Sequence, residues 1–264
     1  MFDQRQPDEI NLEYSEIART LIFLVYADFY LYGGHGLNEL LWNLMVMSAC
    51  FAYIVAMILI SPKLPLPKKV SRKVLHAMIG NLPLIMPFFT ASIYPFLVAS
   101  PFILVTLLAT PYSPIKLGER LSGLSSLTEE GHHNGLVLYA ISYSTLAYLF
   151  GVKPYIVAAG IFPMAYGDSL AAMLGEYWGR HKYKLFEKKS LEGSFGMFLG
   201  SFFSLTLAFI YFSWIYGLTL NPLVPAFTIA CLVTVVEAIS PKGLDNVAVP
   251  LAGAATFLLL SGGV

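Results

Sequence analysis

The sequence predicts an all-α protein, a polytopic transmembrane bundle of about nine helices that contact one another through small residues. Three observations support this fold class. Of the 264 residues, 57% are hydrophobic and only 12% are charged, against about 25% charged residues in a soluble domain. The apolar residues form runs close to the ~20 residues with which a helix crosses a bilayer. These runs lack the alternation of apolar and polar residues that a membrane β-barrel requires.

The expected spans follow from apolar runs that end at proline, glycine and charged residues. The short runs 74–90 and 92–110 could also be tilted or re-entrant helices. No linker or soluble domain interrupts the pattern, so the chain is expected to be a single membrane-embedded domain, 1–264, with its functional motifs in 68–250. The expected spans are 16–32, 38–60, 74–90, 92–110, 134–150, 154–176, 193–216, 222–239 and 247–262.

Lysine and arginine gather on one side of this bundle. They follow the second, fourth, sixth and eighth spans. The loops on the other side, 33–37, 151–153 and 217–221, contain Lys153 as their only lysine or arginine. The positive-inside rule therefore places the charged loops in the cytoplasm. The 16 basic and 16 acidic side chains cancel, so no general positive field predicts a nucleic-acid partner.

The stretch 163–196 carries most of the candidate chemistry, beginning with Asp168 inside the sixth expected span. An ionisable residue in a membrane helix costs about 3 kcal/mol and therefore faces a polar cavity, a charged partner or an ion. Arg180, already in the following loop, lies roughly 18 Å farther along an ideal helix. Either a water-filled cavity reaches Asp168, or the helix breaks near Pro163 and Gly167.

Two series of small residues occur in the same stretch, at intervals of three or four positions. Each series lies on one face of a helix and predicts close packing of the two backbones. The second series directly follows a basic loop, so the amides at this helix start could also bind an anion. The series are Gly167, Ala171, Gly175 and Gly179, then Gly193, Gly196 and Gly200.

Arg72, Lys73 and His76 stand at the charged end of the third expected span. Arginine and lysine at a helix end are often interfacial anchors. They could also clamp phosphate oxygens, which arginine meets as a planar fork and lysine as a point charge.

The remaining charged segments precede or end other spans. In 116–135, His132 and His133 are adjacent, a poor spacing for binding one metal from a helix, whereas Asn134 and Gly135 could begin a helix that faces the same cavity. Glu237 ends the eighth span, and as an intramembrane acid it is expected to be functional.

Together these segments place acidic and basic groups on one face of the bilayer. This inventory suits a polyanion with Mg²⁺, because phosphoryl transfer depends mainly on positioning, carboxylate-held metal and cations near the phosphates. Neither a Walker motif nor a kinase glycine-rich loop is present, and the acceptor is expected to be a lipid. The groups are Asp168, Glu192, Glu237 and Asp245, with Arg72, Lys73, Lys188 and Lys189.

Three motifs resemble the CTP-dependent lipid kinases, which comprise dolichol kinase, phytol kinase and yeast-type diacylglycerol kinase. GDSLAAMLGEYWGRHK followed by KKSLEGS is similar to the central motif of that family, RKVLH to its upstream motif, and VEAISPKGLDN to its later one. The resemblance covers the chain from about Lys68 to Pro250. It implies transfer of the γ-phosphate of CTP to a lipid hydroxyl, with Arg72, Lys73, Asp168 and Gly175 at essential positions.

Within that resemblance we assign roles as follows. Asp168 with Glu192 or Glu237 is expected to bind Mg²⁺, and Asp168, Asp245 or His76 is a candidate base. The acceptor could be dolichol or another polyprenol, geranylgeraniol, phytol or diacylglycerol, and neither the oligomeric state nor a preference for CTP over ATP follows from the residues. The expected nucleotide-binding residues are Arg72, Lys73, Gly175, Lys188, Lys189, Ser190, Gly193 and Ser194.

Two other functions share some of these features. A CDP-lipid synthase also uses CTP but transfers CMP, and the sequence lacks the Asp-Arg-x-Asp signature of such synthases. A secondary transporter also has intramembrane acids and interrupted helices. Its site at the membrane midplane, however, does not require four charged loops on one side.

Overall fold

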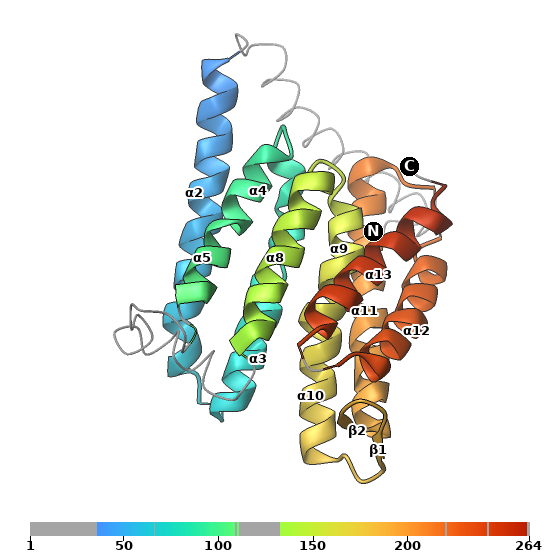
Figure 1. The fold of residues 1–264 in the computed structure, drawn as a ribbon. Coiled ribbons are helices and arrows are strands. Elements are labelled where there is room, and N and C mark those ends of the chain that lie inside the picture. Colours follow the sequence, from blue (N-terminus) through green and yellow to red (C-terminus); the bar gives the residue numbers. More distant parts are fainter. Residues whose placement is uncertain are drawn as a thin grey trace, which may run out of the picture.

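The structure, a computed structural model, describes residues 36–65, 67–108, 110, 133–219, 221–241 and 243–262. The expected span 16–32 lies outside these residues, as does the loop from 116 to 132. Helices dominate the described part (Figure 1). The helices are α2 (Leu37–Ile60), α3 (Lys68–Ile79), α4 (Ile93–Ala99), α5 (Pro101–Leu108), α8 (His133–Phe150), α9 (Pro154–Phe162), α10 (Asp168–Tyr177), α11 (Leu191–Tyr216), α12 (Leu223–Ile239) and α13 (Asp245–Leu260).

Three helices in the described residues are long and apolar enough to cross a bilayer, namely Leu37–Ile60, Pro154–Tyr177 and Leu191–Tyr216. Shorter apolar helices accompany them, and the expected count of about nine spans is not confirmed. The shorter helices are Ile93–Leu108, Gly135–Phe150, Leu223–Ile239 and Asp245–Leu260.

The expected span 74–90 is wrong. The helix α3 begins earlier, at Lys68, and ends at Ile79, and two short 3₁₀ turns follow it, Leu82–Leu84 and Met86–Phe88. Each turn has a proline in its first two positions. Proline lacks an amide hydrogen and fits the first turn of a helix but not its interior. The two prolines therefore begin new short turns and do not continue α3.

The helix α9 is the centre of the bundle. Every residue from Pro154 to Phe162 is buried, as expected for a helix that is apolar on all sides and surrounded by others. It packs against α8, α11 and α13. Figure 1 shows α2, α4, α5 and α8 on one side of α9, and α11, α12 and α13 on the other.

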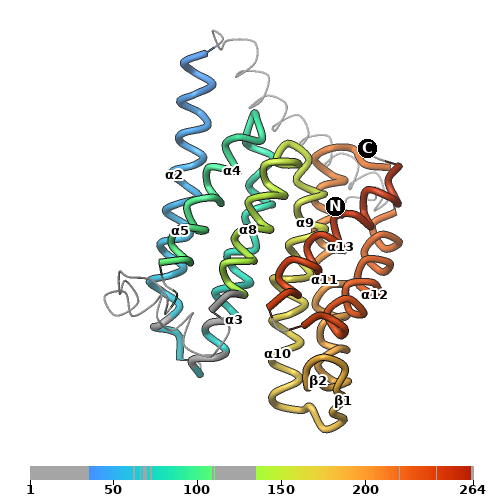
Figure 2. The backbone as a smooth tube through the Cα atoms, viewed as in Figure 1, coloured from blue at the N-terminus to red at the C-terminus, as the bar shows by residue number. Residues whose placement is uncertain are grey.

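The chain passes from α9 into α10 through a π-helical turn, Pro163–Gly167 (Figure 2). The helix is therefore continuous from Pro154 to Tyr177, and of the two alternatives that the sequence left open, a break near Pro163 and Gly167 does not occur. A π-helical turn can accommodate Pro163, which has no amide hydrogen to donate to the preceding turn. Such turns are frequent at functional sites.

The predicted close contact between small residues is confirmed for α10 and α11. A Cβ atom on Gly200 would lie 2.6 Å from the Tyr166 carbonyl oxygen and 2.9 Å from the Gly167 Cα atom. One on Gly196 would lie 2.9 Å from the Leu170 carbonyl oxygen. The two backbones approach so closely because these positions have no side chain.

The basic loop after α10 contains an antiparallel hairpin, β1 (Lys182–Lys184) and β2 (Lys188–Ser190), which the all-α prediction omitted. Ser190 ends the hairpin and caps α11, because its Oγ accepts a hydrogen bond from the Gly193 amide at 3.1 Å. Figure 1 places this hairpin at the same end of the bundle as the connection between α2 and α3.

Candidate active site

A cavity of about 470 Å³ joins a charged region to an apolar one. Its charged region lies between α3, α10, the hairpin and the facing ends of α12 and α13, and its apolar region lies among α2, α3, α4, α5 and α8. The cavity reaches Asp168, so of the two alternatives for this residue the cavity is the one observed. The charged side chains lining it are Lys73, Asp168, Lys182, Glu187, Lys188, Lys189, Glu237 and Asp245, and apolar ones include Ile58, Ile79, Leu82, Phe102 and Val105.

Lys73 and Asp168 form an ion pair between α3 and α10, with Nζ and Oδ2 2.5 Å apart. Their side chains are 22% and 19% exposed, so both charges still contact the cavity. Ser169 reinforces the contact, since its Oγ donates to the Lys73 carbonyl oxygen at 3.1 Å. The sequence left open whether Asp168 forms a structural ion pair or has a functional role. In the structure Asp168 both pairs with Lys73 and lines the cavity.

Lys189 and Glu237 form a second ion pair, between β2 and the last turn of α12. The Lys189 ammonium donates to Glu237 Oε1 and to the Glu237 backbone carbonyl, both at 2.5 Å. A cation at a helix C-terminus satisfies exposed carbonyl groups and the negative end of the helix dipole. The hairpin therefore holds α12 through one lysine, which also faces the cavity.

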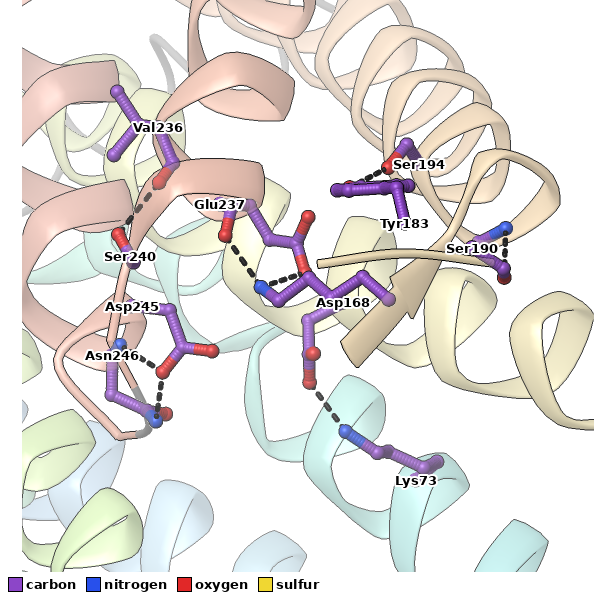
Figure 3. A network of polar contacts seen from close by, with 12 residues as sticks. Lys73, Asp168, Tyr183, Ser190, Ser194, Val236, Glu237, Ser240, Asp245 and Asn246 are labelled. Atoms are coloured by element: carbon purple, nitrogen blue, oxygen red, sulfur yellow. Dashed lines mark hydrogen bonds and ion pairs between the residues drawn. The ribbon is translucent and has the colours of Figure 1, made fainter. Parts of the chain in front are cut away.

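Asp245 begins α13, where a negative charge favours the helix N-terminus. Its Oδ1 accepts hydrogen bonds from the Asn246 amide at 3.0 Å and from Asn246 Nδ2 at 3.1 Å. Figure 3 shows Asp168, Glu237 and Asp245 around the same space, approached from three different helices.

Glu192, the other expected metal ligand, points elsewhere. Its carboxylate accepts from the His181 backbone amide at 3.2 Å and lies 2.7 Å from His181 Nδ1. It is not among the residues that line the cavity. The structure therefore brings Asp168 and Glu237 to one cavity, but not Glu192.

The expected phosphate-binding segment at the start of α11 lines the cavity through Ser190, Gly193 and Ser194. The Gly193 amide is already bonded to its cap, and Ser194 Oγ lies 2.6 Å from the Tyr183 hydroxyl. Gly175 also lines the cavity, where α10 approaches α11: a Cβ on it would lie 3.5 Å from the Gly193 Cα atom.

The upstream motif places Lys73 and His76 on the cavity wall. His76 packs against the ring of Tyr139, with 4.3 Å between ring centroids. Arg72 lies in α3 directly before Lys73, and its side chain is outside the described residues. Gly135, which the sequence offered as a possible helix start beside the cavity, lies near the start of α8 and lines the cavity.

The donor set fits Mg²⁺ only in part. Among the described residues, no group of three or more His, Cys, Asp or Glu side chains is placed to hold a metal ion. Mg²⁺, however, is commonly bound through one or two carboxylates together with substrate phosphates and water. Asp168, Glu237 and Asp245 suit an ion that arrives with a nucleotide, and they do not form a preformed cage.

Several cavity residues were missed by the sequence reasoning: Tyr139 and Tyr143 on α8, Asn246 on α13, and Lys182 and Glu187 at the hairpin. Lys182 donates to the Gly175 carbonyl oxygen at 3.0 Å. The two tyrosines are four residues apart on α8, so helical spacing could have identified them as one face.

Comparisons with known proteins place the chain beside lipid alcohol kinases. It is 40% identical over 143 residues to the phytol kinase of Synechocystis sp. This alignment covers 52% of this chain and 60% of that protein. It is 28% identical over 237 residues to a protein of Triticum aestivum named probable phytol kinase, chloroplastic, covering 83% of this chain and 77% of the relative. It is 26% identical over 217 residues to phytol kinase 1, chloroplastic, of Arabidopsis thaliana, and this alignment covers 78% of this chain and 71% of the relative.

No protein-family model and no solved structure matches the chain. The alignment with the Synechocystis protein spans less than two thirds of that relative. The resemblance to lipid kinases that the motifs indicated is nevertheless confirmed, because this chain is a homologue of proteins named phytol kinase.

Proposed function

We propose that this protein transfers the γ-phosphate of CTP to the hydroxyl of a membrane lipid alcohol, with phytol as the first acceptor to test. The observation that carries the proposal is the cavity itself, because its charged and apolar regions are continuous. A lipid alcohol has a single polar atom at the end of a long apolar chain. A cavity with one charged and one apolar region matches both parts of such a molecule.

In this proposal the lysines of the charged region bind the phosphates. Lys188 and Lys189 approach from the hairpin and Lys73 from α3, so positive charge comes from two sides. Asp168, Glu237 and Asp245 would supply carboxylates to a magnesium ion that arrives with the nucleotide, and such an ion would add positive charge against the phosphate oxygens. Phosphoryl transfer needs this positioning and charge more than it needs a strong base.

The reaction forms a bond between the alcohol oxygen and the γ-phosphorus and breaks the bond from that phosphorus to the oxygen bridging it to CDP. CDP leaves with the bond electrons, and the alcohol proton passes to a cavity carboxylate or to water. Asp168 and Asp245 both line the cavity and are the candidate acceptors. The preference for CTP rests on the family resemblance, and parallel reactions with ATP test it.

The decisive experiment uses the full chain purified in lipid nanodiscs, with Mg²⁺ and CTP labelled on either the α- or the γ-phosphate. Acceptors are phytol, geranylgeraniol, dolichol and diacylglycerol. We expect label in the lipid from γ-labelled CTP and none from α-labelled CTP. Label from the α-position would instead support a CDP-lipid synthase, and a lack of nucleotide consumption with every lipid would favour a transporter.

A further inference from the structure

Two tyrosine hydroxyl groups are buried on the wall of the cavity and have no hydrogen-bond partner in the part of the chain that the structure describes. Tyr139 and Tyr143 lie one turn apart on α8 and are 5% and 4% exposed. Both line the cavity, and neither phenolic oxygen has a hydrogen-bond partner among the described residues. Burying a hydroxyl without a partner is unfavourable, so these oxygens are candidates for contact with a ligand.

Tyr139 lies where the charged region meets the apolar one. Its ring packs against His76, which lies three residues after Lys73 on α3, and Asp168 lines the same cavity. Tyr143 contacts the Tyr139 ring edge-on, with 6.0 Å between centroids. It belongs to the same buried hydrophobic cluster as Cys50 of α2, and Tyr53 packs against that cluster.

We propose that the Tyr139 hydroxyl binds the alcohol oxygen of the acceptor and holds it beside Lys73 and Asp168. The inference rests on the proposed function, since it assigns the acceptor part of the same cavity. A phenol can both donate to and accept from an alcohol, and it is neutral like its ligand. The lysines Lys73 and Lys189, by contrast, are cations that the proposed function assigns to the phosphates.

The arrangement also gives a basis for selectivity. A site built around a buried hydroxyl disfavours ligands that cannot hydrogen-bond to it, because the hydroxyl then stays unpaired. The apolar walls accept an alcohol and an alkane equally. We therefore expect the Tyr139 hydroxyl to contribute to the discrimination between the two.

The test compares Tyr139→Phe with wild type, because this change removes one oxygen and keeps the ring. We expect kcat/KM for phytol to fall about 10- to 100-fold and KM for CTP to stay within about 2-fold. The thermal midpoint is expected to stay the same or rise, since the variant removes an unpaired buried hydroxyl. A midpoint that falls together with activity would show a structural bond and overturn the proposal.

Two further variants locate the effect. Tyr143→Phe removes the other cavity hydroxyl and is expected to lower kcat/KM less than Tyr139→Phe; a larger effect would move the alcohol one turn deeper and overturn the assignment. Tyr155→Phe is the matched control, because Tyr155 is equally buried but packs against Phe212 and Phe257, away from the cavity. It is expected to match wild type.

A binding measurement separates this inference from the proposed function. Phytol should raise the thermal midpoint of wild-type protein more than the corresponding alkane does, and this difference should become clearly smaller in Tyr139→Phe. Transfer by wild type with unchanged transfer by Tyr139→Phe defeats only the tyrosine assignment. A wild type without transfer defeats the proposed function, and the comparison of alcohol with alkane still decides whether Tyr139 binds a hydroxyl.

Discussion

The Lys73–Asp168 pair is only partly desolvated, with about a fifth of each side chain exposed to the cavity. A fully buried pair resists change, because removal of one partner leaves an uncompensated charge at a cost of about 3–5 kcal/mol. Here the cavity moderates that cost, and the carboxylate can interact with a ligand while it remains beside Lys73.

The first prediction concerns Asp168→Asn, which keeps the shape of the side chain and removes its charge. We expect phosphate transfer to fall at least about 100-fold, because the variant loses the carboxylate that we assign to magnesium binding or to accepting the alcohol proton. The protein should still fold, with a modest drop in thermal midpoint from the unpaired Lys73. Labelled-phosphate transfer and thermal unfolding in the same nanodiscs measure both effects, and wild-type activity in this variant would remove Asp168 from the mechanism.

The second prediction compares two lysines of one hairpin. Lys189→Met is expected to raise KM for CTP at least about 10-fold, because an amine that faces the cavity no longer meets the phosphates. Lys184→Met is the matched control, since Lys184 is exposed on β1 and does not line the cavity. Equal effects of the two changes on KM would point to the overall charge of the hairpin and contradict a specific contact.

Individual site residues could be predicted where burial of charge is expensive. Asp168 and Glu237 were identified because an acid in an apolar run requires a partner, and both reach the cavity. Glu192 was predicted from its place in the same motif, but its carboxylate turns to His181. Sequence adjacency fixes the helix that carries a residue, whereas the direction of its side chain depends on neighbours from distant segments.

At the scale of elements, the contact between α10 and α11 determines where the two parts of the site lie. Asp168 and Gly175 are on α10, and Gly193 and Ser194 are on α11. These groups share a cavity because glycines let the helices approach closely. The hairpin continues through Ser190 directly into α11. A wider contact between α10 and α11 would therefore move the hairpin away from Asp168.

The third prediction tests this contact with Gly200→Ala. Its new methyl group would meet backbone atoms of Tyr166 and Gly167, which cannot move aside like the end of a side chain, so we expect a loss of about 1–3 kcal/mol in unfolding free energy. Ile210→Ala, at a 52% exposed position of the same helix, is the control and should cost less. Unfolding in a denaturing detergent series measures both, and equal stability of Gly200→Ala and wild type would contradict a contact limited by glycine.

The long helices could be predicted from the lengths of the apolar runs, whereas the turns and the hairpin could not. The runs at 38–60, 154–176 and 193–216 match the long helices within a few residues. The run 74–90 failed because Pro83 and Pro87 restart the chain as 3₁₀ turns. The hairpin strands, at three residues each, are too short for alternation to identify.

For the whole molecule, the cavity links two environments that a membrane enzyme must connect. The described basic segments, including the hairpin and the connection between α2 and α3, lie at one end of the bundle (Figure 1). The apolar region of the cavity lies among helices α2, α5 and α8. In the proposed reaction, the nucleotide would occupy the charged region and the lipid chain the apolar region, provided that the charged end faces the compartment that contains nucleotide.

The last prediction is that the hairpin faces the cytoplasm and the connection between α11 and α12 faces the opposite side, as the positive-inside rule requires. Lys184→Cys and Thr219→Cys report the two sides, because both positions are exposed. They are made in a background with Cys50→Ala and Cys231→Ser, which removes both native thiols. A membrane-impermeant maleimide is then applied to sealed vesicles of known orientation.

Lys184→Cys is expected to react only in inside-out vesicles and Thr219→Cys only in right-side-out vesicles, while the background protein does not react in either. The physical reason is that each loop stays in the aqueous phase on its own side and the reagent cannot cross the bilayer. Reaction of both positions from one side would contradict an α11 that spans the bilayer. A reversed result would place the lysine-rich cavity entrance away from cytoplasmic nucleotide, and a kinase that uses CTP could not then operate in this orientation.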